Sequence, residues 1–237
     1  MTLEQERSSP QGGSSLTDIE FNDEHSGETP LSYATPWLDI SICAGNCNDL
    51  VVGGTIGQLE LLEQATVIEI GVLTTASNMF KGCISLRSVP LFDTSSVVSH
   101  ASMFDLCTSI TTVELFDTSS SLNVTNMFDD CYMLVSVPLF DTSSVTNASY
   151  MFYNCRSILE IPLFDLSSVV TAAGLVRGCH SLKTLPLFDL SSCTNFFQGA
   201  HSCISLRSVP PFVFGAGVNL GTTFYGCYAL TGVSTLD

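Results

Sequence analysis

Residues 127–150 read MFDDCYMLVSVPLFDTSSVTNASY, and this stretch recurs along the chain with a period of 24 residues. The clearest marker is a column of seven cysteines: Cys83, Cys107, Cys131, Cys155, Cys179, Cys203 and Cys227. A phenylalanine column keeps the same period, nine residues after each cysteine: Phe92, Phe116, Phe140, Phe164, Phe188 and Phe212. Self-similarity at a fixed period of this length is the signature of stacked repeats. The sequence therefore predicts a repeat solenoid over residues 55–237.

Local patterns within one repeat predict its shape. Apolar residues spaced by three around each cysteine favour a short helical turn that leads into a short parallel strand. The proline that follows cannot donate to a ladder, so its column belongs at an edge or a turn. The next residues, Asp-Thr-Ser-Ser, are typical of a turn in which the carboxylate accepts backbone N–H groups.

The remaining chain divides into pieces of different composition. Residues 1–35 are polar and acidic, which predicts an arm that is flexible alone or ordered along a partner. Residues 36–54 are expected to form an N-terminal cap, with a strand at 37–42. A degenerate coil begins near Thr55, seven recognisable coils follow, and the last is truncated at Asp237 with no polar cap.

Composition narrows the function classes. The chain has seven Lys and Arg residues against 23 Asp and Glu, a net charge of −16, which disfavours nucleic-acid binding. The first residues show no basic region followed by an apolar run, so no secretion signal is expected. No apolar stretch approaches the length of a membrane helix. We therefore expect a protein made in a cytoplasm and not inserted in a membrane.

The cysteines could be buried apolar residues, disulfides or metal ligands. Interior ladder cysteines each have two equivalent neighbours, so pairing would be incomplete, and burial is favoured. Cys43 and Cys47 lack a second ligand pair at zinc spacing, although a local disulfide stays open. The aspartate column could bind turn N–H groups or a row of calcium ions, but each coil supplies one carboxylate there. We expect no metal and no cofactor.

The motif complete at 127–147, and nearly so at 151–170, resembles the BspA-like branch of leucine-rich repeats. Repeats of this kind are known from bacterial surface adhesins and lipoproteins, and from tail-fibre and other virion proteins of bacteriophages. The resemblance implies a right-handed solenoid used for binding, without catalytic residues, so the protein is not expected to be an enzyme. Local departures are Leu175–Val176, Gly199–Ala200, Thr223 and Val213.

A candidate binding face follows from columns that vary between coils. The six basic residues of the array all lie two residues before, one after or four after a ladder cysteine. Aromatic residues and histidines share these columns, and such residues are enriched where proteins bind partners. The alternative is that the columns are merely exposed. The candidate contact residues are Tyr153, Arg156, Arg177, His180, His201, Tyr225 and Tyr228.

These observations lead to one functional hypothesis and one alternative. The hypothesis is a non-catalytic phage virion component, of a tail fibre or baseplate, made in the host cytoplasm and assembled into an oligomeric particle. Its arm and its uncapped end would contact other virion proteins, and its repeat face a host glycan, a host protein or a neighbouring subunit. The alternative is a cellular surface adhesion or protein-interaction protein.

Overall fold

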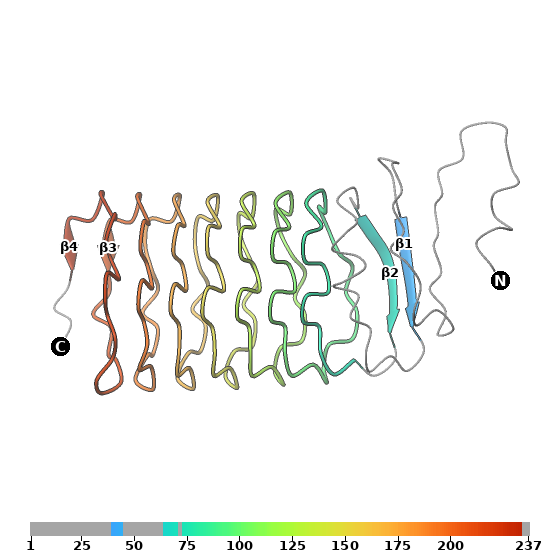
Figure 1. Cartoon of the computed structure of the whole chain (residues 1–237), viewed down its shortest axis with the longest axis horizontal. Helices are drawn as coiled ribbons and strands as arrows, with labels where there is room; N and C mark the ends of the chain where they lie inside the picture. Colours follow the sequence, from blue (N-terminus) through green and yellow to red (C-terminus); the bar gives the residue numbers. More distant parts are fainter. Residues whose placement is uncertain (1–38, 45–63, 71–72, 234–237) are drawn as a thin grey trace, which may run out of the picture.

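The computed structural model describes residues 39–44, 64–70 and 73–233, which form an elongated stack of coils (Figure 1). β1 (Asp39–Ala44) pairs in parallel with β2 (Gln64–Ile70) beside the N-terminal end of the stack. β3 (Ser208–Val209) pairs in parallel with β4 (Gly232–Val233) at the other end. β1 overlaps the strand expected at 37–42. The arm at 1–35, the rest of the cap and the start of the degenerate coil lie outside the described residues.

Neighbouring coils are held in one register along the whole stack. Parallel bridges join Ser99 to Asn123, Asn123 to Asn147, and so on through Asn219, always 24 residues apart. Polar side chains at these positions also close local turns, since the Asn147 side chain accepts the N–H of Ser149 at 3.0 Å. The sequence period therefore equals the chain length of one coil.

Tight turns replace the short helical turn that the sequence favoured around each cysteine. The described residues contain no helix, and none of them forms a segment long and apolar enough to cross a membrane. In the coil of Cys131, the N–H of Met127 donates to Val124 and that of Cys131 to Phe128. Asn126 and Asp130, each third in such a turn, have positive φ of 56°, the pattern of type II turns. Apolar residues three apart fit these turns as well as they fit a helix.

The other N–H groups of this turn-rich segment all point toward the next coil of the stack. Asn126 donates to Ser149, Phe128 to Met151 and Asp130 to Tyr153, at 2.9–3.0 Å. Equivalent bonds recur in each coil from Ala76 to Ser202. Alternate N–H groups of the turn-rich segment thus close turns within the coil, and the N–H groups between them bind the next coil.

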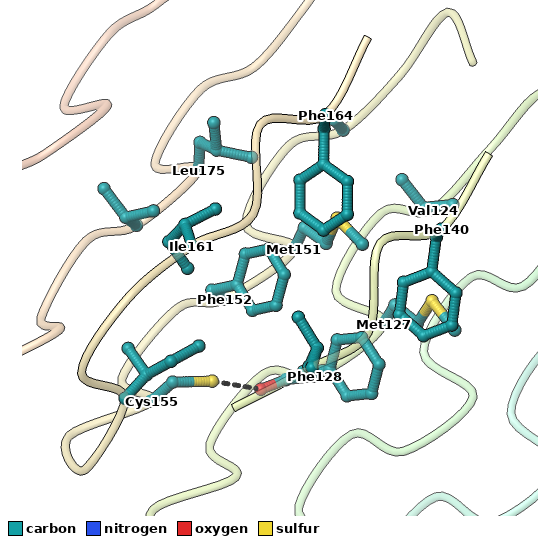
Figure 2. Close-up of a cluster of buried hydrophobic side chains, with 14 of the residues drawn as sticks. Val124, Met127, Phe128, Phe140, Met151, Phe152, Cys155, Ile161, Phe164 and Leu175 are labelled. Atoms are coloured by element: carbon teal, nitrogen blue, oxygen red, sulfur yellow. Dashed lines mark hydrogen bonds between the residues drawn. The ribbon is translucent and has the colours of Figure 1, made fainter. Parts of the chain in front are cut away.

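The core consists of columns of identical side chains in contact. Phe104, Phe128 and Phe152 stack with ring centroids 5.5–5.6 Å apart and nearly parallel planes. Phe140 and Phe164 flank this stack from the opposite side of the coil (Figure 2). These rings are almost fully buried. Contact between equivalent apolar residues of adjacent coils is the main stabilisation of the array.

All seven ladder cysteines are buried, and none of them forms a disulfide with a described residue. Six of them donate a weak hydrogen bond to a carbonyl of the preceding coil, and Cys155 to Phe128 at 3.0 Å is one example (Figure 2). Burial raises the pKa of the Cys83 thiol to about 12. The column therefore consists of small apolar residues that each carry one useful donor.

Candidate functional site

The candidate site lies on two columns of mostly half-buried or exposed side chains that flank the cysteine ladder, and we call these columns the variable face. The first column lies two residues before each cysteine, and the second lies one residue after it. The turns around each cysteine point these side chains away from the core, because Phe128 and Cys131 face inward on either side of Asp129 and Asp130. The rigid turns thus fix where each variable side chain begins.

The structure stacks the predicted residues along each column. The guanidinium of Arg177 lies 5.2 Å from the ring centroid of Tyr153. The rings of His201 and Tyr225 lie 5.2 Å apart in the same column. Arg177 also donates to the side-chain carbonyl of Gln198. Tyr153 and Arg177 therefore form one stacked pair between adjacent coils, and His201 and Tyr225 form another.

In the second column, a predicted residue stacks on a residue that was not predicted. Arg156 lies 4.6 Å above the ring of Tyr132, a tyrosine one coil earlier that was not among the candidates. Tyr132 occupies the same sequence column as Arg156, so its position could have been used to include it. Gln198 carried no such signal, because its own column contains no other glutamine.

The candidate residues differ in how far they are exposed to solvent. His180 is half-buried, with no hydrogen bond or ring contact to the described residues. Tyr225 and Tyr228 are 68% and 86% exposed, although large aromatic side chains are usually buried. Burial and the Arg177 charge lower the pKa of His201. The later coils therefore present the more accessible aromatic surface.

The early coils carry acidic groups on the same face. Lys81 forms an ion pair of 2.8 Å with Asp105. Burial, and then the charges of Asp105 and Asp130, raise the pKa of Asp129 to about 7. Asn126 donates to one oxygen of Asp129, and the other oxygen is buried without a partner among the described residues. The variable face thus changes from acidic to basic and aromatic along the stack.

A separate aspartate column lies outside this face. One oxygen of Asp93 accepts both the N–H and the hydroxyl of Ser95, at 3.0 and 2.7 Å. Asp117, Asp141 and Asp165 repeat both bonds with the serine two residues on. These bonds lower the pKa of each carboxyl. Turn N–H groups therefore satisfy this column, and no described group of three ligating side chains could hold a metal.

Comparison with known proteins identifies one family. No curated protein and no solved structure matches the chain. The family described as "Mycoplasma protein of unknown function, DUF285" matches residues 70–201, which is more than half of the chain. The matched segment contains the first five ladder cysteines and most of the stacked phenylalanines. The chain therefore belongs to the DUF285 repeat family, a Mycoplasma family related to BspA-like surface repeat proteins.

Proposed function

We propose that the protein is a non-catalytic binding protein whose variable face contacts a macromolecular partner. The observation that supports this most is the stacking of side chains along the variable face: the guanidinium groups of Arg156 and Arg177 lie on Tyr132 and Tyr153, and the imidazole of His201 lies on Tyr225. Such stacking holds long side chains in one geometry, so less conformational entropy is lost on binding. The fold needs none of these residues, since their columns vary from coil to coil.

The proposed ligand is a surface glycan, with a protein surface as the other possibility. Tyrosine rings offer flat apolar faces to sugar rings, while arginine N–H groups donate to hydroxyl or carboxylate oxygens. Tyr225 and Tyr228 are the most exposed aromatic side chains among the described residues. An anionic glycan would suit Arg156 and Arg177 and would be repelled by the acidic early coils.

Two settings fit such a face, and each has its own support. A phage virion component, of a tail fibre or baseplate, is supported by the resemblance of the repeat to those of phage fibres. A cellular surface adhesion protein is supported by the family match, because the family is related to surface repeat proteins. The anchoring role of residues 1–35 in a virion stays a prediction, since they lie outside the described residues.

Binding by the variable face can be tested on the purified protein. Changing Arg156, Arg177 and Tyr225 together to alanine should abolish binding on a glycan array and reduce adsorption to cells, without lowering the thermal unfolding temperature. The matched control changes Arg87 and Arg207, which lie in another exposed column, to alanine. If the triple variant binds like the wild type, the variable face is only an exposed surface.

The setting needs a different measurement. Antibodies against the array, applied to intact cells and to purified phage particles, should label the particles if the virion proposal holds. Labelling of uninfected cells alone would favour the adhesion protein. Deleting residues 1–35 should leave a folded array that fails to incorporate into particles, and normal incorporation would contradict the anchoring role.

A further inference from the structure

A row of exposed leucines runs along the array, each one residue before a phenylalanine of the column that contains Phe140. Its members are Leu91, Leu115, Leu139, Leu163 and Leu187. Each has 56–61% of its surface exposed. Single exposed leucines are ordinary, but five aligned at the coil repeat form a continuous apolar strip. The fold does not require leucine at a position this exposed.

The local backbone fixes these leucines outward. The N–H of Phe140 donates to the carbonyl of Pro138 at 3.0 Å, which closes a three-residue turn with Leu139 at its apex. The same bond occurs around Leu115, Leu163 and Leu187, at 2.8–3.1 Å. Since the phenylalanine beside each apex is held in the core, the leucine cannot turn inward.

A parallel row of carboxylates accompanies the leucines. Asp93, Asp117, Asp141, Asp165 and Asp189 each follow a leucine by two residues and are exposed. The serine bonds use one carboxylate oxygen and leave the other open toward solvent. From the proline column to the end of the Ser-Ser turn no described coil contains Lys or Arg. We call the leucine and aspartate rows together the Leu–Asp ladder.

The spacing of the ladder selects the shape of what could cover it. Hydrogen-bonded neighbouring chains lie about 4.8 Å apart, so the five leucines span about 19 Å. On an α-helix, apolar residues alternating at three and four positions recur about every 5.3 Å along the axis. On a strand, residues of one face recur about every 6.7 Å. A helix laid along the stack therefore stays in step with the leucines, and a strand does not.

From this geometry we propose that the Leu–Asp ladder binds a basic amphipathic α-helix of a partner protein, about 13 residues long. Its apolar seam would lie on the leucines, and Lys or Arg beside the seam would face the aspartates. The ladder ends where Pro211 and Val213 replace Leu and Asp, which limits the helix to five coils. A second copy of this surface would set one aspartate row against another, and an anionic membrane would be repelled.

Three labelled peptides of 15 residues test the proposal against the full chain. The first has Leu at helical spacing with Lys on both flanks. The second has the same composition with Leu and Lys alternating, and the third is the first with Glu in place of Lys. Fluorescence anisotropy should show at least tenfold tighter binding of the first peptide, weakening as salt rises. Its helicity by circular dichroism should increase on binding.

Variants assign the binding to the ladder. Leu139→Ser with Leu163→Ser should weaken the first peptide at least tenfold, because the apolar strip is interrupted at its centre. The matched control, Leu122→Ser with Val170→Ser, removes apolar residues of another column that are about half exposed and should change affinity less than twofold. Asp141→Asn with Asp165→Asn keeps the acceptors for the serines and should flatten the salt dependence.

Several outcomes would overturn the proposal. They are failure of the first peptide to bind, equal binding of the second, or full binding to the leucine variant. Sedimentation that shows a dimer in the wild type but a monomer in the leucine variant would assign the ladder to contacts between copies. Binding to phosphatidylcholine vesicles that the leucine variant loses would assign it to a lipid surface.

Discussion

At the scale of single residues, the ladder cysteines from Cys107 onward each fill a small buried site and donate one hydrogen bond to the preceding coil. The carbonyl of Phe128 accepts the N–H of Cys131 at 3.2 Å and the thiol of Cys155 at 3.0 Å, so both of its lone pairs are used. Thr223 repeats the pattern with its hydroxyl, which donates to Phe196 at 3.0 Å. Valine or alanine would fill the space and leave that second bond unmade.

Thiol reactivity should differ sharply along the column of ladder cysteines. Burial raises the pKa of Cys131 and Cys155 well above its ordinary range, and the thiolate is the reactive form. A hydrogen bond from Cys203 lowers the pKa of Cys227, which is also the least buried member. Native labelling with iodoacetamide at pH 8, read by peptide mass spectrometry, should therefore modify Cys227 first. Equal labelling of Cys131 would contradict the packing.

One buried imidazole makes stability depend on pH. His100 occupies a core column, its Nδ1 lies 3.1 Å from the Ser121 hydroxyl, and burial lowers its pKa to about 4. Below pH 6.5, the ordinary pKa of histidine, His100 is protonated in the unfolded chain but stays neutral in the folded chain. The folded state therefore loses stability as pH falls toward 4. Between pH 8 and pH 5 the loss is about 2 kcal/mol.

Urea unfolding at several pH values measures this loss. His100→Val, which copies Val124 of the next coil, should remove it. Asp129 acts in the opposite sense, because its raised pKa lets the folded chain bind a proton first, and stability rises as pH falls below about 7. Asp129→Asn should therefore steepen the loss on acidification. An unchanged profile in the histidine variant would show that His100 is not the cause.

At the scale of one coil, the sequence predicted which columns face inward but not the backbone that presents them. Spacing by three brings residues together in a helix and in successive tight turns alike. The feature that separates the two is positive φ, and its positions hold residues as different as Asn126, Leu106, Thr222 and Gly226. Because glycine occupies only some of these positions, composition did not reveal the turns.

The irregular coil near Gly199 shows how packing can be kept when a column is broken. Gly199 and Ala200 replace Met and Phe, and the ring of Phe196 fills their space, contacting Phe212 and Phe214. A Cβ at position 199 would overlap that ring. The departure seen in the sequence is therefore a local exchange of volume between two columns.

A double-mutant cycle tests this exchange. Gly199→Met should cost about 1–3 kcal/mol by overpacking, and Phe196→Val should cost a similar amount by leaving a cavity. Together they restore two positions of the coil of Cys131, Val124 and Met127, so the double variant should lose at least 1 kcal/mol less than the sum. Urea unfolding gives all four free energies, and simple additivity would contradict the account.

At the scale of the whole molecule, each coil contacts only its neighbours, and that makes length adjustable. Removing residues 127–150 joins Asn126 to Met151 and keeps every column in register. Circular dichroism should show a folded array with a smaller urea m-value, because less surface is exposed on unfolding. Deleting only residues 127–138 should abolish cooperative unfolding, since half a coil moves apolar columns to the surface.

Only the location of the candidate site could be predicted from the sequence, because the contacts within the site join side chains of different coils. Columns that vary are visible in a repeat sequence, so the variable face could be located. Contacts between neighbouring coils depend on side-chain reach, so the pairs Arg156–Tyr132 and Arg177–Gln198 required the structure. Similarly, the exposure of Leu139 follows from a turn that the prolines alone did not specify.

Within the turn-rich segment of each coil the hydrogen bonds to the neighbouring coil all run one way, although bonds elsewhere, such as those from Leu122 to Val98 and from Thr146 to Leu122, run the other way. Neighbouring strands in ordinary sheets largely cancel their dipoles, but here the N–H groups from His100, Ser102 and Phe104 all aim at the next coil, and later coils repeat this. The turn-rich side of each coil therefore directs its amide N–H groups toward the Cys227 end of the stack and its carbonyls toward the Leu73 end. An acceptor group of a ligand would meet these donors only at the Cys227 end, beside the exposed Tyr225 and Tyr228.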